Sequence, residues 1–483
     1  MNYNTEDIRR IAEEIANLVQ ENIRQKQSES QELQTMAMFE LAFRETLRQI
    51  GAEALGIFLS GLQATPESEI ACACGGKLHY QRMRPAVMTT VFGKVEYRRA
   101  YYAGCSCGQG VAPLDKTYGL EAGAISSGLA QLMALAGIGF SFKESEQWLK
   151  EFLLFEVSEN SIRSETQQIG RLQREGEAEN IQTSQNENAL QARLREEQPV
   201  PKRLYGSLDA AKVRIEPRPR KGEAVADHED WRDMKVGCWY QAEAVLLSRQ
   251  SARQRQKAQR EGTVFRTTHH HYYCDIAHVD PFGKLVWATG CQVSADLAAE
   301  LVFVCDGAAW IWELVAQYYP NAVQIVDWFH AEDRLKRLAD AVFPSPAQRQ
   351  SWLAQVVESL WQGQVEEVLL ACQHLASQHE EARQAVTYFS NNGQRMRYDF
   401  FRAQGYLIGS GTIESGCKQI VTQRLKRSGA QWTVEGAVLT AKARAAWLSG
   451  HWHSLCQKQA RLPLAIRHLL RAHKVKLQIT RQA

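Results

Sequence analysis

Two apolar segments of this chain end on an aspartate, and a third segment opens a helix that carries a glutamate. Leu204–Asp209 and Leu301–Asp306 are the apolar runs, and Glu414 lies in the glycine-rich start of the helix. Short apolar runs of this kind are typical of strands buried on both faces, and carboxylates at their ends lie together at one rim of a sheet. We therefore expect Asp209, Asp306 and Glu414 to converge.

Such a trio of carboxylates has a specific chemistry. Hard oxygen ligands with open positions suit Mg²⁺ or Mn²⁺, and two such ions about 3.5–4 Å apart can activate water and stabilise the leaving oxygen of a phosphodiester. A single aspartate at the end of a strand is more often a helix cap. Together, Asp209, Asp306 and Glu414 are predicted to be the catalytic residues and the ligands of two Mg²⁺ or Mn²⁺ ions.

Short motifs spread over nearly the whole chain give a resemblance to a known family. They are Gly75-Gly76-Lys77-Leu78, Phe92-Gly93-Lys94-Val95-Glu96, Pro113-Leu114-Asp115, Ser207-Leu208-Asp209, Cys305-Asp306-Gly307-Ala308, Asp327-Trp328-Phe329-His330, Ile408–Lys418 and Arg424–Trp432. In these motifs the chain resembles the DDE transposases of bacterial insertion sequences, specifically the ISKra-type family of the RNase H-like transposase and integrase superfamily.

The apolar pattern and the resemblance together predict a multidomain chain of α+β and α/β parts. A length of 483 residues exceeds one ordinary core. We expect N-terminal amphipathic helices (1–65), a Cys-rich β module (66–120), a helical DNA-binding region with linker (121–200), an RNase H-like mixed-sheet catalytic core (201–342, completed by 406–450 with Glu414), an all-helical insertion (343–405) and a basic tail (451–483). Strands are expected at Leu204–Asp209, Lys235–Ala244, Tyr272–Ala277 with Val286–Thr289, Leu301–Asp306 and Ala322–Asp327.

Four of the eleven cysteines are paired in the sequence. Cys72 and Cys74 precede a predicted β-hairpin that turns near Phe92-Gly93-Lys94, and Cys105 and Cys107 follow it. Four thiolates brought together in this way make a structural zinc site, although the Cys-x-Cys spacing is tighter than the usual pair and leaves reduced, unmetallated cysteines as the alternative. Five others look like scattered small apolar residues of a reducing compartment. They are Cys238, Cys274, Cys291, Cys372 and Cys456.

A helical region after this module has the pattern of a helix-turn-helix. Helices are expected at Phe142–Leu154 and Ser158–Arg171, with Ser158 as N-cap. The polar face of the second helix would present Asn160, Arg163 and Gln167 to double-stranded DNA. Ordinary helical packing explains the same pattern equally well.

Basic character is concentrated late in the chain, since Glu435 is the only acidic residue from Arg424 to the end. We expect Lys418, Arg424, Lys426 and Arg427 to bind the DNA backbone. Trp432 would stack on a displaced base. His330 would position phosphate or water, or simply pack against a helix. The basic segment Arg249–Arg260 is either a DNA contact or a solvated insert.

These features predict a DNA transposase that binds the ends of its insertion sequence, cleaves them with divalent metal and joins them to target DNA. The alternatives are a catalytically silent DNA-binding protein derived from a transposase and a structure-selective RNase H-like nuclease. We expect a homodimer or higher oligomer on DNA. No apolar run of about 18 residues and no signal-peptide core is present, so a cytoplasmic location at the nucleoid, without membrane contact, is expected.

Overall fold

The computed structural model describes residues 5–27, 35–63, 65–120, 125–189, 200–216, 230–245 and 263–461. The chain divides into two compact units, one formed by Met1–Thr166 with Ser454–Ala483 and the other by Gln167–His453. The expected basic segment at 249–260 and most of the expected basic tail, from residue 462 onward, lie outside the described residues. No helix in the described ranges is long and apolar enough to cross a membrane.

The first unit begins with a helical hairpin and a small antiparallel sheet. Its elements are α1 (Thr5–Gln27), α2 (Met36–Gly61), β1 (Glu69–Ala71), β2 (Lys77–Thr90) and β3 (Gly93–Ala103), with the sheet in the order β1-β2-β3. The predicted hairpin is present, and Gly93 supplies the positive φ of its turn. Helix α2 packs closely on β3, because a Cβ at Gly56 would lie 2.3 Å from the carbonyl oxygen of Glu96.

Short helices complete the first unit. They are α3 (Pro113–Tyr118), α4 (Ser127–Gly139), α5 (Phe142–Leu153), the beginning of α6 (Glu159–Ser184) and, from Ser454 onward, α19 (Trp452–Arg461). Ser141 and Glu144 form a capping box at the start of α5, and the hydroxyl of Ser158 caps α6 by accepting the N–H of Ser161. The helix pair expected from the sequence is therefore present. Helix α6 continues beyond the predicted end at Arg171 and enters the second unit.

A five-stranded mixed sheet forms the centre of the second unit. Its strands are β4 (Arg203–Ile215), β5 (Asp230–Ala244), β6 (Phe265–Asp275), β7 (Glu300–Cys305) and β8 (Val323–Val326), in the order β6-β5-β4-β7-β8. The first three strands pair antiparallel, while β7 and β8 run parallel to β4. An α/β unit with a mixed sheet was expected, and it is found.

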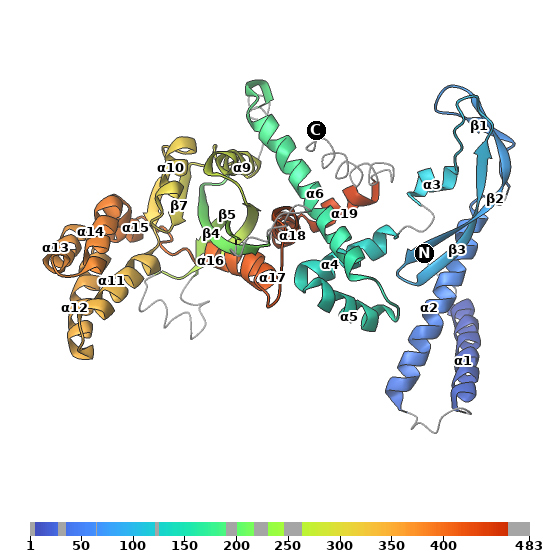
Figure 1. The fold of residues 1–483 in the computed structure, drawn as a ribbon, viewed down its shortest axis with the longest axis horizontal. Helices are drawn as coiled ribbons and strands as arrows, with labels where there is room; N and C mark the ends of the chain where they lie inside the picture. Colours follow the sequence, from blue (N-terminus) through green and yellow to red (C-terminus); the bar gives the residue numbers. More distant parts are fainter. Residues whose placement is uncertain are drawn as a thin grey trace, which may run out of the picture. The chain divides into compact units, whose positions relative to one another are not determined.

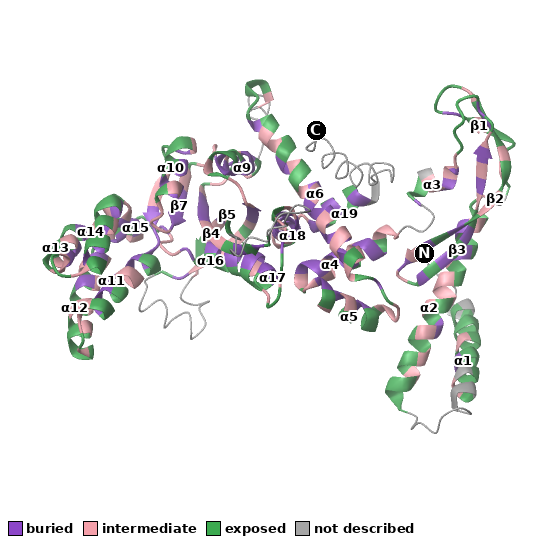
Figure 2. Ribbon diagram, viewed as in Figure 1, coloured by how far each residue is buried: buried purple, intermediate pink, exposed green. Residues whose placement is uncertain are grey.

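Helices cover both faces of this sheet (Figure 1). One face is covered by α9 (Val279–Gln292) and α10 (Ala309–Tyr318), where the indole N–H of Trp239 donates to Thr289 Oγ1 at 3.1 Å. The other face carries α16 (Gly411–Cys417) and α18 (Val434–Leu448), where a Cβ at Gly416 would lie 2.6 Å from the ring of Tyr272. Because both faces are covered, the central strands are buried, as Figure 2 shows.

Four strand predictions need correction. Strand β5 begins at Asp230 and not at Lys235, and β6 spans Phe265–Asp275 and not Tyr272–Ala277. Strand β4 does not end at Asp209 but continues to Ile215, where Val213 and Ile215 are buried and Arg214 between them is exposed. The predicted strand Val286–Thr289 is part of α9 instead. A short apolar run is compatible with a buried strand and with the buried side of a helix. Here the run belongs to a helix that covers one face of the sheet.

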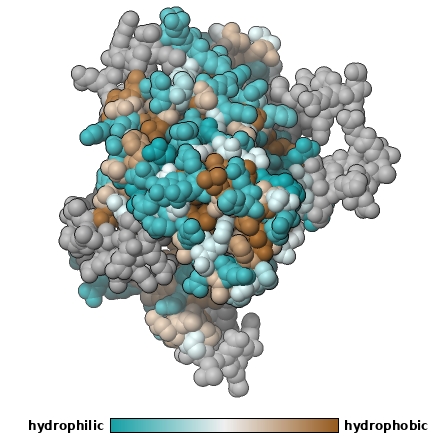
Figure 3. Space-filling model, turned by 90° about the vertical axis from the view of Figure 1, so that its left-hand side faces the viewer, coloured by the Kyte–Doolittle hydropathy of each residue, from teal (hydrophilic) through white to brown (hydrophobic). Residues whose placement is uncertain are grey.

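The helical insertion expected between the last strand and the Glu414 helix is present. It follows α11 (Trp328–Val342) and contains α12 (Pro346–Trp361), α13 (Val365–Ala376), α14 (Glu380–Asn392), the 3₁₀ turn η2 (Gly393–Met396) and α15 (Tyr398–Ala403). Its core includes Val368, Phe389 and Tyr398, which are fully buried. On the face drawn in Figure 3, hydrophilic side chains surround separate small hydrophobic groups.

Candidate metal-binding and catalytic site

Three aspartates lie in one row across neighbouring parallel strands. The register pairs Gly206 of β4 with Phe303 of β7, and Cys305 of β7 with Val326 of β8. If each pairing is continued toward the C-terminus in the same register, Asp209 lies opposite Asp306, and Asp306 lies opposite Asp327. The N–H of Asp327 donates to the carbonyl of Cys305 at 2.7 Å, and this hydrogen bond fixes Asp327 beside Asp306.

Asp327 is completely buried, and its carboxylate is held by three hydrogen bonds. It caps α11 by accepting the backbone N–H of His330 at 2.9 Å, and the same oxygen accepts His330 Nδ1 at 2.6 Å. Its other oxygen accepts the backbone N–H of Ser410 at 2.7 Å. The aspartate therefore ties the end of β8 to the segment that leads into the Glu414 helix.

Contacts at the start of α16 position Glu414. The hydroxyl of Ser410 donates to Glu414 Oε1 at 3.0 Å, and the N–H of Trp328 donates to the carbonyl of Ile408 at 3.0 Å. Directly after α16 the chain forms a π-helical turn, η3 (Lys418–Thr422), a rare geometry that is frequent at functional sites. These contacts bring Glu414 to the carboxyl end of the parallel strands.

Asp327, His330 and Glu414 form a compact group. Their ligand atoms all lie within 4.8 Å of one another, and His330 Nδ1 is 3.9 Å from Glu414 Oε1. The hydrogen bond to Asp327, reinforced by the charges of Asp327, Glu414 and Asp306, raises the pKa of His330 to about 9. The imidazole is therefore a cation at neutral pH, with Nδ1 bound to Asp327.

Asp209 completes the site from β4. Burial, with a contribution from the charge of Asp306, raises its pKa, while the backbone N–H of Ala210 and the thiol of Cys417 lower it. Cys417 lies three residues after Glu414, on the same side of α16. Asp209 and Asp306 are electrostatically coupled to each other and to His330, so all five acidic and imidazole groups share one region.

The donor set fits a hard divalent cation. Asp209 within β4, Asp306 after β7 and Glu414 of α16 offer carboxylate oxygens, which is the ligand chemistry that Mg²⁺ and Mn²⁺ take. Of the predicted three, only Glu414 belongs to the group whose ligand atoms lie within 4.8 Å of one another, where its neighbours are Asp327 and His330. Burial and a like charge raise the pKa of Asp209, and a cation would relieve both effects. The Asp306 carboxylate accepts the N–H of Ala308 at 3.0 Å, which leaves acceptor capacity for a metal.

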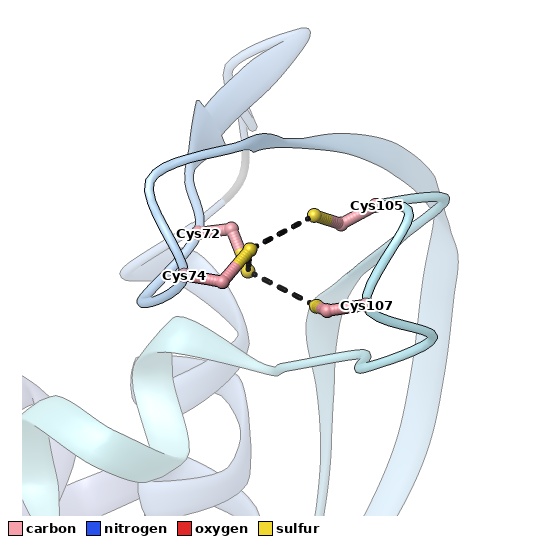
Figure 4. Close-up of side chains that lie close together, drawn as sticks. All are labelled: Cys72, Cys74, Cys105 and Cys107. Atoms are coloured by element: carbon pink, nitrogen blue, oxygen red, sulfur yellow. Dashed lines mark hydrogen bonds between the residues drawn. The ribbon is translucent and has the colours of Figure 1, made fainter.

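The paired cysteines of the first unit form a second cluster. Their sulfurs face one another from the loop between β1 and β2 and the loop after β3 (Figure 4). Neighbouring sulfurs lie 3.3 Å (Cys74–Cys105), 3.4 Å (Cys72–Cys74) and 3.6 Å (Cys72–Cys107) apart. Four thiolates around one zinc at about 2.3 Å would lie about 3.8 Å apart, so the cluster needs only a small expansion.

The loops are shaped for this cluster. A Cβ at Gly76 would lie 2.7 Å from Cys105 Sγ and 3.5 Å from Cys74 Sγ. The backbone N–H of Cys107, with the neighbouring thiols, lowers the pKa of Cys105 to about 6. The Cys74 N–H also lowers the pKa of Cys72, but hydrogen bonds between the thiols and burial outweigh it and raise that pKa to about 12. Cys105 therefore ionises more easily than Cys72.

The residues expected to contact DNA in this region differ in how far they are exposed. Lys418 and Lys426 are exposed, and Arg427 is half-buried with its Nε donating to the carbonyl of Gln423. Arg424 is only 1% exposed, and its guanidinium lies 5.0 Å from the ring centroid of Trp432. Trp432 is 6% exposed and donates its Nε1–H to Leu425, so neither Arg424 nor Trp432 offers its side chain to DNA in this conformation.

The expected recognition residues of α6 lie on both sides of the unit boundary. Asn160 is exposed in the first unit, and Arg163 donates to it at 3.0 Å and to Glu159 at 2.6 Å. Gln167 is half-buried and is the first residue of the second unit.

No protein-family model matches the chain, and no curated protein is similar to it. Among solved structures, the chain is similar to the Drosophila P element transposase strand transfer complex, over 73% of this chain and 84% of that chain. The sequence identity is 8% and the TM-score is 0.23.

Sequence reasoning missed two residues of the site. Asp327 lies in the motif Asp327-Trp328-Phe329-His330 that carries the family resemblance, but only His330 of that motif is predicted from the sequence as a site residue. Cys417 gave no signal beyond its spacing from Glu414, because a cysteine in a buried helix is usually a small apolar residue. Both are identified by what their side chains contact.

Proposed function

We propose that the protein is a DNA transposase that acts on the ends of its own bacterial insertion sequence. It cleaves a phosphodiester at the element end and joins the freed 3′-hydroxyl to target DNA, by a DDE mechanism. The observation that carries the proposal is the row of aspartates across β4, β7 and β8 with Glu414 beside it. Clustered carboxylates at strand ends are suited to phosphodiester chemistry.

Asp209, Asp306 and Glu414 would hold two Mg²⁺ or Mn²⁺ ions. Bound divalent ions supply an activated water and charge stabilisation at phosphate oxygens. Asp306 and Asp209 come from a rigid sheet, and Ser410 orients Glu414 through its hydroxyl. His330, held by Asp327 at Nδ1, directs a positive charge at the DNA phosphate from its other ring nitrogen.

The remaining predicted parts take supporting roles in this proposal. The Cys72, Cys74, Cys105 and Cys107 cluster binds one structural zinc that fixes the loops of the β module. Lys418, Lys426 and Arg427 contact the DNA backbone near the site. The start of α6 contributes further DNA contacts from Asn160 and Arg163, with Gln167 following in the second unit, and the protein acts as an oligomer on paired ends.

A strand-transfer assay tests the proposal. Duplexes with the terminal sequences of the element that encodes this chain are incubated with the protein, a supercoiled plasmid and Mg²⁺ or Mn²⁺. The proposal predicts cleaved ends and joined products with the parent, and neither with Glu414→Gln. Cleavage without joining would identify a nuclease, and binding without cleavage would identify a DNA-binding protein.

A further inference from the structure

A pocket of the second unit lies between α10, α11, α14 and the turn η2. Its volume is about 750 Å³. Gly307, which follows Asp306 in the chain, forms part of its wall, and a Cβ at Gly307 would lie 2.2 Å from the ring of Tyr388. None of the carboxylates of the proposed catalytic site is among the residues that line it. The pocket is therefore a neighbour of that site and has its own set of side chains.

Two half-buried arginines line this pocket, and each lies over an aromatic ring. The guanidinium of Arg334 is 4.9 Å from the ring centroid of Tyr388, and that of Arg395 is 4.9 Å from the ring centroid of Trp312. Neither arginine forms an ion pair with a carboxylate in the part of the chain that the structure describes. Burial lowers the pKa of Arg395, with no carboxylate to offset it. Two cations held partly out of water without counter-charges favour the entry of an anion.

Both guanidinium groups have hydrogen-bond donors to spare. Arg395 Nε donates to Gln324 Oε1 at 2.7 Å, and its Nη1 donates to the carbonyl of Asn391 at 3.1 Å and to Asn392 Oδ1 at 3.3 Å. These bonds fix the plane of the guanidinium and leave Nη2 without an acceptor among the described residues. Arg334 donates to none of them. The arginines therefore offer the planar forks of N–H groups that bind oxyanions.

Helix α10 adds further donors to the same pocket. Trp312 is only 4% exposed, yet its indole N–H has no hydrogen-bond partner within the described ranges, which costs free energy for a buried donor. The helix begins beside the pocket at Ala309, and its cap residue, Ala308, makes no side-chain hydrogen bond to the first turn. Helix N-termini favour negative charge. An anion in the pocket would offer an acceptor that the chain itself does not provide.

We propose that this pocket binds a phosphate monoester, held by Arg334, Arg395 and the start of α10. Two guanidinium charges balance the dianion, and its tetrahedral oxygens accept donors that come from several helices, whereas a carboxylate is planar and carries one charge. The volume suits the phosphate together with the nucleoside that carries it. A DNA strand with a 5′-phosphate and a free nucleotide both present such a group. The inference goes beyond the proposed function and does not depend on it, since none of the catalytic carboxylates takes part.

The test titrates inorganic phosphate into the full-length protein in a calorimeter, at constant ionic strength and without Mg²⁺ or Mn²⁺. We expect saturable binding of one phosphate per chain. Arg334→Gln and Arg395→Gln should each weaken it by about tenfold or more, because each removes a charged donor. Glu313→Gln should tighten it about twofold, since Glu313 is an exposed like charge that lines the pocket. Arg337→Gln, at an exposed arginine of α11 that pairs with Asp333, is the control and should bind like the parent.

Competition against inorganic phosphate identifies the source of the group. The competitors are a single-stranded pentanucleotide with a 5′-phosphate, deoxythymidine 5′-monophosphate and the 5′-hydroxyl form of each. Displacement by the phosphorylated pentanucleotide assigns the pocket to a DNA strand end, and displacement by the mononucleotide alone assigns it to a free nucleotide. The 5′-hydroxyl forms should not compete.

Several results would overturn the inference. They are the absence of saturable phosphate binding, equal displacement by acetate, and a failure of both phosphorylated competitors. Because Arg395 also holds Gln324, weaker binding by Arg395→Gln with unchanged binding by Arg334→Gln would show a packing effect and would equally count against the site. Each of these results leaves the proposed function intact, because strand transfer is measured separately.

Discussion

At the scale of single residues, the pair of Asp327 and His330 makes stability depend on pH. The hydrogen bond to buried Asp327 raises the pKa of His330 to about 9, above the value of about 6.5 in the unfolded chain. The folded state binds the proton more tightly, so the contribution is complete below about pH 6.5 and is lost as the pH rises through about 9. We expect the free energy of unfolding of the metal-free parent to fall over this interval.

His330→Asn should flatten that fall, since asparagine keeps a hydrogen-bond donor but does not titrate. Denaturant unfolding at a series of pH values measures the slope. His374→Asn, at an exposed histidine on α13, is the matched control and should retain the parent slope. Equal slopes for the parent and His330→Asn would show that the pair contributes no pH dependence.

A site residue can be predicted from the sequence when its position follows from neighbouring residues, and not when it depends on packing between distant segments. Asp306 and Glu414 stand at recognisable strand and helix ends, so their shared region could be anticipated, whereas Asp209 reaches it from within β4, which continues to Ile215. Arg424 and Trp432 have the composition of a DNA-binding segment, yet each is buried against the other. Burial results from packing between distant segments, and one-dimensional charge patterns do not contain it.

At the scale of elements, the cysteine loops depend on one glycine. Gly76→Ala places a Cβ 2.7 Å from Cys105 Sγ and 3.5 Å from Cys74 Sγ, and Gly76 does not have a positive φ that would exclude alanine. We expect the variant to bind less than one equivalent of zinc, or to release it much faster to a chelator. Zinc content by elemental analysis and release kinetics with a chromogenic chelator check this.

Gly61→Ala is the control for that substitution. Gly61 lies at the end of α2, and a Cβ there would meet nothing within 4 Å. It should keep zinc at the parent level. Full zinc binding by Gly76→Ala, or unchanged folding of a zinc-free Cys72→Ser variant, would show that the cluster is not a structural metal site.

Elements that begin or end on turn and cap residues were predictable from the sequence, whereas an element without such residues was not. The β-hairpin about Gly93 and the capped helices α5 and α6 have local signals in turn and cap residues. The run Val286–Thr289 has no such signal, and its apolar residues suit a strand and a sheet-covering helix alike. Only the contact of α9 with the finished sheet decides between them.

At the scale of the whole molecule, DNA affinity and fold stability should respond to different basic residues. Lys426 is exposed, so Lys426→Ala should weaken binding to all duplexes alike and lower the log–log salt slope by about one unit. Arg424 is buried on Trp432, so Arg424→Ala should cost more than about 1 kcal/mol of unfolding free energy. Salt-dependent binding curves and denaturant unfolding measure the two effects.

Lys77→Ala, at an exposed lysine of β2, is the control and should change neither quantity much. An unchanged salt slope for Lys426→Ala would place the DNA path elsewhere. Unchanged stability of Arg424→Ala would mean that its burial against Trp432 contributes little.

Asp306→Asn tests the central claim most directly. The substitution preserves shape and hydrogen bonding but removes a ligand charge, so metal-dependent cleavage of element ends should slow by about a thousandfold or more, while DNA binding survives. Loss of repulsion with Asp209 should stabilise the metal-free protein by about 0.5–1 kcal/mol. Asp333→Asn, on the exposed side of α11, should behave like the parent in both measurements. Cleavage by Asp306→Asn at near the parent rate in Mg²⁺ or Mn²⁺ would contradict the assignment of this row of carboxylates as the catalytic site.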